Sequence, residues 1–173
     1  DDLRMIVINM RKRLPVWADA ATRADLLKRF GYVFETPAGS SYPPILDMNE
    51  ITGAFAITGA GGEIDLTPFD VAHGGINALG FRIGDMAYLP DVSDIPDNAW
   101  HHLHNLKLWI VDALRYDPHF SHTHVEKTLG WIKLAKPEHS IITNMHVDLD
   151  YTTLQSELPP GVEPAFDMMT KTI

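Results

Sequence analysis

The spacing of apolar residues changes between the two halves of the chain, and this change limits the fold more than any other feature of the sequence. In the first half, short runs of strand-like residues are separated by turns rich in Gly and Pro, which is typical of β-structure. In the second half, apolar segments of strand length alternate with segments of helical spacing. The sequence therefore predicts an α/β protein, mostly β at the start and alternating β and α afterwards.

The expected elements can be located from their caps, turns and periodicity. One helix begins near Asp19 or Thr22, either of which can cap a helix, and it ends at Gly31. The other elements expected in the first half are strands at residues 14–18, 63–69, 79–83 and 86–89, two short strands within residues 45–57, and loops at residues 36–44 and 71–75. In the second half we expect helices at residues 94–104, 122–135 and 150–158 and strands at residues 106–113, 140–145 and 162–166.

Length and charge limit the organisation and the partners of the chain. Its 173 residues can bury a sizeable core, and we expect a single domain over residues 1–173. The formal net charge is −9 and the densest basic run is only three residues long (residues 11–13), so nucleic acid is not an expected partner. No apolar run approaches the roughly 20 residues of a membrane span, and a cytoplasmic location with no membrane partner is the simplest interpretation.

The absence of cysteine and the abundance of histidine restrict the chemistry of any metal site. Without cysteine, disulfides, thiolate zinc sites and cysteine nucleophiles are excluded, and a metal must be held by His, Asp, Glu, Asn or backbone oxygen. Of nine histidines, eight lie between His101 and His146. His101, His102 and His104 are expected on an exposed helix and are assigned no role.

Candidate ligands fall at the ends of expected strands. His73 and Asp91 each follow a strand, Asp112 ends another, and Asn144 and His146 would point to one face if the strand at residues 140–145 continues past residue 144. Each has a structural alternative when taken alone: a histidine packed for stability, or a carboxylate that caps a turn. Taken together, these strand ends predict a site assembled at one edge of a sheet.

A segment rich in histidine follows the apolar strand at residues 106–113. Asp112 needs a partner if it is buried, and orienting a ligand histidine would supply one. His119, His122 and His124 lie in the sequence DPHFSHTHVE. His122 and His124 would diverge on a helix and could share one metal only in extended geometry. The alternative is that at least two of these three histidines face solvent near the start of the helix.

Four segments, in this order, resemble one enzyme family: LGFRIGDMAYLPDVSDIP, LWIVDALRYDPHFSHTHVE, ITNMHVDLDY and ELPPGVEPAFD. They resemble metallo-β-lactamase-fold hydrolases, and within them the phosphoribosyl cyclic phosphate phosphodiesterase branch, which is related to tRNA 3′-processing endonucleases. The resemblance covers essentially the whole chain. It implies an α/β fold, the αββα metallo-β-lactamase-like sandwich, which holds two divalent metal ions, Zn or Mn, at the sheet edges.

The resemblance also implies roles for particular residues. His73 matches the family's single histidine ligand, Asp91 matches the carboxylate that bridges both metals, and His122 matches the histidine that protonates the leaving oxygen. The last ligand position, normally the histidine of a Thr-His pair, falls on Asn144. Either Asn144 or His146 is expected to take that place.

One departure from the family is the absence of its H-x-H-x-D-H motif. In the family this motif comes just before the segment with which this sequence starts, so the resemblance implies that four ligands and the N-terminal strands are missing. The chain is then either a fragment or a truncated relative. We expect it to hold a partial metal site and to expose apolar sheet surface that favours a homodimer.

The favoured hypothesis is a metal-dependent phosphodiesterase acting on a small phosphorylated substrate, a cyclic phosphate or a nucleotide-like diester. A metal-activated hydroxide would attack phosphorus, and the cations would offset the negative field of the chain. His122 would act as general acid, Asp112 would orient a histidine and Arg115 would contact the phosphate. The alternatives are a non-catalytic remnant or binding module of the same fold, and an RNA 3′-end processing nuclease, against which the acidic charge counts.

Overall fold

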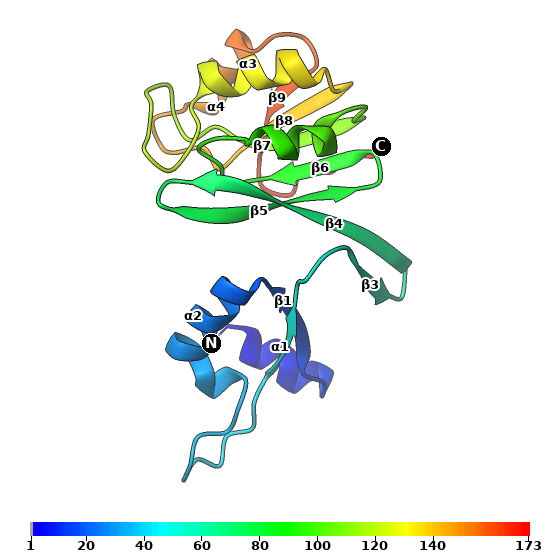
Figure 1. Cartoon of the computed structure of the whole chain (residues 1–173), viewed down its shortest axis with the longest axis vertical. Helices are drawn as coiled ribbons and strands as arrows, with labels where there is room; N and C mark the ends of the chain where they lie inside the picture. The colour runs from blue at the N-terminus through cyan, green and yellow to red at the C-terminus, as the bar shows by residue number, and fades with distance from the viewer. Residues whose placement is uncertain (1) are drawn as a thin grey trace. The chain divides into compact units, whose positions relative to one another are not determined.

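The computed structural model describes residues 2–173, and the chain divides into two compact units after Gly53. Figure 1 shows the elements of each unit, and the two units are described separately below. Every helix among the described residues is too short or too polar to cross a bilayer. The single domain expected over residues 1–173 stays a prediction.

The N-terminal unit contains a two-stranded parallel sheet and three helical segments. Its elements are α1 (Leu3–Met10), β1 (Leu14–Ala18), α2 (Ala20–Phe30), the 3-10 helix η1 (Gly31–Val33) and β2 (Leu46–Glu50). β1 and β2 pair in parallel. The Asp19 carboxylate accepts a hydrogen bond of 2.6 Å from the Thr22 backbone N–H, so Asp19, and not Thr22, caps α2. A small apolar cluster holds these elements together: Val7, Val33, Phe34, Ile45 and Leu46.

The C-terminal unit is built on a seven-stranded mixed sheet in chain order from β3 to β9 (Figure 1). The strands are β3 (Phe55–Gly59), β4 (Gly62–His73), β5 (Ile76–Ile83), β6 (Met86–Leu89), β7 (Leu108–Asp112), β8 (His139–Thr143) and β9 (Val162–Pro164). The pairs from β3 to β6 are antiparallel, and those from β6 to β9 are parallel. It follows that β4, β6, β7 and β8 all run in the same direction, so their carboxyl ends lie at one edge of the sheet.

Two buried clusters attach the helical segments to this sheet. The 3-10 helix η2 (Asp97–Leu103) and α3 (Val125–Ala135) contribute to one cluster, which also contains Trp109 of β7. α4 (Tyr151–Glu157) packs through Leu154 in the other cluster. The sheet and its helices therefore form a rigid support for the loops at the carboxyl ends of the strands.

Several predicted elements are confirmed with small shifts at their ends. The hairpin at residues 79–83 and 86–89 is present as β5 and β6, with its turn at Gly84 and Asp85. The two strands expected within residues 45–57 are β2 and β3, which are separated near Gly53. The helix expected at residues 94–104 is shorter and of the 3-10 type.

Three boundaries near the candidate ligands were predicted wrongly. Residues 71–73 are not a loop, because β4 stays paired with β5 as far as the His73–Ile76 pair. The helix expected from residue 122 begins at Val125, because the Thr123 backbone N–H donates to Val92 and keeps this segment extended. The strand expected to continue past residue 144 ends at Thr143, because Asn144 adopts a left-handed conformation with φ of 59°.

Candidate metal centre

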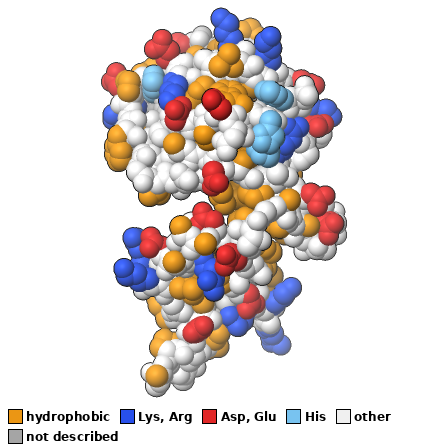
Figure 2. All heavy atoms as spheres, viewed as in Figure 1, with side chains coloured by type: hydrophobic (Ala, Val, Ile, Leu, Met, Phe, Trp, Pro, Cys, Tyr) orange, Lys and Arg blue, Asp and Glu red, His pale blue; other side chains and the backbone are white. Residues whose placement is uncertain are grey.

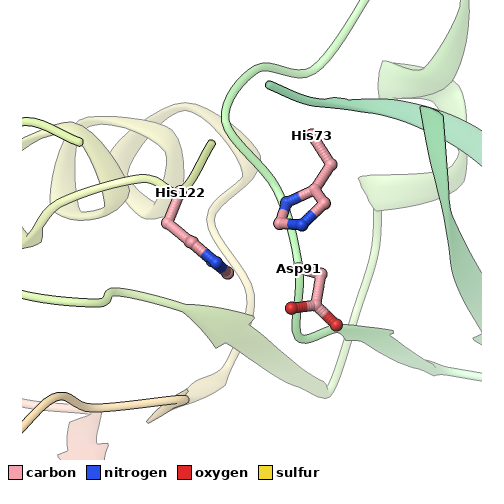
Figure 3. A group of neighbouring side chains, drawn as sticks. All are labelled: His73, Asp91 and His122. Carbon is pink, nitrogen blue, oxygen red and sulfur yellow. The ribbon is translucent and has the colours of Figure 1, made fainter. Parts of the chain in front are cut away.

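Three predicted site residues come together at the edge where the same-direction strands end. His73 is the last residue of β4, Asp91 lies two residues beyond β6, and His122 lies in the extended segment before α3. Each offers a ligand atom, and these atoms lie within 4.8 Å of one another. Figure 3 shows the two imidazole rings and the carboxylate converging on one space. Two histidines and a carboxylate are a donor set that suits a divalent transition metal.

The imidazole of His73 provides a test of whether this cluster fits a metal ion. Its Nδ1 atom is buried and has no hydrogen-bond partner among the described residues. Its ring lies 4.6 Å from the ring of His122, centroid to centroid, at an interplanar angle of 77°. A buried nitrogen without a partner is costly, and a metal ligand bond would remove that cost. The residues present therefore fit a divalent cation.

Asp112 lies behind His122 and connects several parts of the centre. Its side chain is completely buried at the end of β7. Its Oδ2 lies 2.8 Å from His122 Nδ1 and accepts a hydrogen bond of 3.3 Å from the Val92 backbone N–H, next to Asp91. A carboxylate on the outer nitrogen of a histidine fixes its tautomer and ring orientation. Asp112 is thus in position to orient His122.

Burial raises the pKa of Asp112, because the charged carboxylate loses water that the protein replaces only in part. The hydrogen bonds from His122, Val92 and Asn144 act in the opposite direction. These same contacts stabilise the ionised form that can pair with His122. The hydrogen bonds from these neighbours therefore offset part of the free-energy cost of burying the charged Asp112 carboxylate.

A network of hydrogen bonds between backbone and side-chain groups fixes the turns that carry these ligands. The Ser93 hydroxyl accepts a hydrogen bond from the Gly74 backbone N–H at 3.1 Å, and the Ser93 backbone N–H donates to the Ala72 carbonyl at 2.7 Å. Lys127 of α3 donates to the Ser93 carbonyl at 2.7 Å and pairs with Asp94 at 3.1 Å. The loop after β6 is thereby attached to both the end of β4 and α3.

Asn144 and His146, the two candidates for the last ligand position, occupy different surroundings. The Asn144 Nδ2 donates to Asp112 Oδ1 at 3.4 Å and lies 3.2 Å from His122 Nδ1, so Asn144 adjoins the cluster. His146 is half-exposed and its Nδ1 lies 2.9 Å from an Asp148 oxygen. The argument that both share one strand face fails, because the left-handed turn at Asn144 ends the strand.

Arg115 and His119 lie in the loop that follows β7. Arg115 donates to the Asp117 carbonyl from Nε at 3.2 Å and to the Pro118 carbonyl from an Nη at 3.0 Å, which stabilises this loop. Its predicted contact with a phosphate stays a prediction. The His119 ring lies 5.6 Å from that of His122, and desolvation, followed by the Arg115 charge, lowers the pKa of His119. The sequence contained no signal that separated His119 from His124.

Comparison with known proteins agrees with this geometry. The family described as "Beta-lactamase superfamily domain" matches residues 1–145. The chain belongs to this superfamily. Its members are generally metal-dependent hydrolases, and the mixed sheet of the C-terminal unit is the one expected for the metallo-β-lactamase fold. Both the predicted fold and the predicted family are therefore confirmed.

Solved structures of metallo-β-lactamase-fold proteins resemble this chain closely. A diphosphatase from the PhnP family superposes with a TM-score of 0.78 at 28% identity, over 90% of this chain and 56% of that protein. The short form of human tRNase Z gives a TM-score of 0.59 at 13% identity, over 91% of this chain and 66% of that protein. Zn²⁺-bound PqqB from Methylobacterium extorquens gives a TM-score of 0.68 at 12% identity, over 94% of this chain and 66% of that protein. The last two likenesses show the fold alone.

One curated relative is named as a transferase and not as a hydrolase. An octanoyltransferase of Porphyromonas gingivalis is 30% identical to this chain over 172 residues, which are 96% of this chain and 33% of that protein. The chain thus spans about a third of the length of this curated relative. It spans just over half of the diphosphatase.

Proposed function

We propose that this superfamily member is a metal-dependent phosphodiesterase that acts on a small cyclic phosphate or a nucleotide-like diester. The observation that carries the proposal is the convergence of His73, Asp91 and His122, with the buried Asp112 carboxylate on the outer nitrogen of His122. The likeness to a diphosphatase at 28% identity supports a phosphorylated compound as the substrate class.

His73 and Asp91 are the residues that would hold a divalent metal ion, Zn²⁺ or Mn²⁺. Asn144 adjoins the cluster and could add its amide oxygen, whereas His146 is engaged with Asp148. When bound, such a cation supplies a Lewis acid that neutralises phosphoryl charge and lowers the pKa of water. This local positive charge would also explain how a chain of net charge −9 attracts an anionic substrate.

His122 is the proposed proton donor to the leaving oxygen. Its Nδ1 faces Asp112 at 2.8 Å, which leaves Nε2 to exchange a proton with the substrate. The Asp112 carboxylate fixes the direction of the His122 ring. A positioned imidazole is suited to general acid catalysis near neutral pH.

The alternative of an RNA 3′-end nuclease receives less support. On the face of residues 54–173 that Figure 2 shows, Lys and Arg side chains are scattered among acidic ones and do not form one patch. Binding to a long polyanion requires several cationic contacts to its phosphates. A small phosphorylated substrate requires only the metal centre and its immediate neighbours, which is why we favour it.

The octanoyltransferase name is not carried over to this chain. The match covers a third of that relative, so the activity in its name belongs to a protein much longer than the matched part. The cluster of histidines and carboxylates favours metal-assisted hydrolysis.

The test is hydrolysis of bis(p-nitrophenyl) phosphate by protein loaded with Mn²⁺ or Zn²⁺, with the bound metal measured by elemental analysis. We expect release of p-nitrophenol that stops on chelation and returns when metal is added. Absence of turnover by protein that contains stoichiometric metal would refute the proposal. Absence of stoichiometric metal would instead favour the non-catalytic module, and salt-dependent binding of tRNA would favour the nuclease.

A further inference from the structure

An aromatic side chain, Phe120, stands exposed beside the metal centre. Phe120 retains 80% of its accessible surface, although it lies only two residues before His122. One edge of its ring is seated over Gly74, the residue after His73. A Cβ atom placed on Gly74 would lie 3.2 and 3.3 Å from two carbons of this ring and 2.9 Å from Ser121 Cβ. The ring therefore lies close to the turn that follows His73.

The ring of Phe120 is connected to the centre by a series of aromatic contacts. Its centroid lies 4.8 Å from that of His119, which lies 5.6 Å from His122, and His122 lies 4.6 Å from His73. A ligand that places its phosphate at the metal centre can therefore extend its remaining atoms along this row of rings.

The loop that carries Phe120 is stabilised on both sides of the ring. Before it, Arg115 donates two hydrogen bonds to the carbonyls of Asp117 and Pro118. After it, the Ser121 hydroxyl lies 3.2 Å from His119 Nδ1. Single exposed apolar side chains are common on protein surfaces. Phe120, in contrast, lies beside the turn that follows His73, on a loop whose backbone these bonds stabilise, and its exposed face is open to a ligand.

We propose that Phe120 stacks against the base of a nucleotide whose phosphate is bound at the metal centre. The inference rests on the proposed function and narrows its substrate class from small phosphate esters to nucleotides. Every base presents a π-face, and phenylalanine has no hydrogen-bonding group, so stacking here would raise affinity without selecting among bases. The expected contribution is about tenfold in the dissociation constant, within the range of base-aromatic stacking.

The test compares adenosine 5′-monophosphate with ribose 5-phosphate, which differ only in the base. Binding of each to the Mn²⁺-loaded protein would be measured by isothermal titration calorimetry. We expect the nucleotide to bind about tenfold more tightly to the wild type. Phe120→Ala should abolish this preference, and Phe120→Trp should keep or increase it. Phe166→Ala, which removes another exposed aromatic ring of the same unit, is the matched control and should leave the preference unchanged.

Three outcomes would overturn the inference. They are equal affinity of the wild type for both ligands, an equal loss for both ligands in Phe120→Ala, and no binding of either ligand. The proposed function is tested separately by turnover of bis(p-nitrophenyl) phosphate. A protein that hydrolyses this diester but shows no base preference would keep the phosphodiesterase proposal and refute the role of Phe120.

Discussion

Replacing the buried carboxylate of Asp112 tests whether its contact with His122 Nδ1 orients the His122 ring. In Asp112→Asn, an amide oxygen at the Oδ2 position can still accept from the Val92 N–H and from His122 Nδ1. The negative charge is lost, and the NH2 group at the Oδ1 position can no longer accept the 3.4 Å hydrogen bond from Asn144 Nδ2. Because burial disfavours the ionised carboxylate, its removal also relieves a desolvation cost. The two effects oppose one another, so we expect the free energy of unfolding to change by less than about 1 kcal/mol.

Asp112→Ala should be more damaging than Asp112→Asn for a reason that the geometry supplies. Alanine removes every acceptor, and the Val92 N–H is then left buried without a partner, whereas His122 is only partly buried and can reach water. An unsatisfied buried donor costs about 1–3 kcal/mol. We therefore expect the wild type and Asp112→Asn to have similar free energies of unfolding, and Asp112→Ala to be less stable than both.

Function should respond differently from stability. Loss of the carboxylate that orients His122 should reduce turnover by about 10–100-fold. Metal affinity should change less, because His122 is the proposed proton donor and the metal is assigned to His73 and Asp91. Zinc affinity would be measured by competition with a chromophoric chelator, turnover with the chromogenic diester, and stability by urea denaturation. Asp70→Asn, which changes an exposed carboxylate on β4 of the same sheet, is the control and should change none of these. An Asp112→Asn variant with wild-type turnover would refute the role assigned to this carboxylate.

Three further predictions follow from individual contacts. Gly74→Ala should lower the free energy of unfolding, measured by urea denaturation, by at least about 1 kcal/mol. Gly74 has φ of 62°, and the added Cβ would lie 2.9 Å from Ser121 Cβ. In the control Gly75→Ala the added Cβ meets nothing within 4 Å, so the free energy of unfolding should not change. His73→Ala should weaken zinc binding more than tenfold in the competition titration, and the exposed His104→Ala should not. Hydrogen bonds from the start of α4 lower the pKa of Asp150, so its stabilising effect is present above its ordinary value of 3.8 and lost as pH falls through the lowered pKa. The difference in urea midpoint between wild type and Asp150→Ala should therefore shrink below about pH 4.

Local patterns were sufficient to predict most strands of the sheet. The β5–β6 hairpin follows from alternating residues on both sides of Gly84 and Asp85, and these signals lie within a few positions of one another. The helix α1 was not predicted, because its apolar residues fall on all sides and only Val7 is buried. Such a segment has no clear period, and periodicity is the main signal for a helix.

The surroundings of the last ligand position depend on long-range contacts that the sequence does not display. The strand was expected to continue past Asn144, which would have placed Asn144 and His146 on one face. Asn144 instead turns into the left-handed region and directs its amide toward Asp112, a residue 32 positions earlier. Asparagine is one of the residue types that tolerate this conformation. The local sequence does not show that Asn144 adopts it, because the hydrogen bond of its amide is made to Asp112 on the neighbouring strand β7.

Strand direction explains why individually weak signals combined into one site. His73, Asp91, Asp112 and Asn144 each end or closely follow a strand, and β4, β6, β7 and β8 run the same way, so all four residues reach the same edge. Asp112 ends β7, which lies between β6 and β8, and it contacts the segments that follow both of these strands. Phe120, in contrast, lies outside the metal centre and contacts the ring of His119, which lies next to that of His122. Variants of Asp112 should therefore alter the turnover of every substrate, whereas variants of Phe120 should alter only the preference for ligands that carry a base.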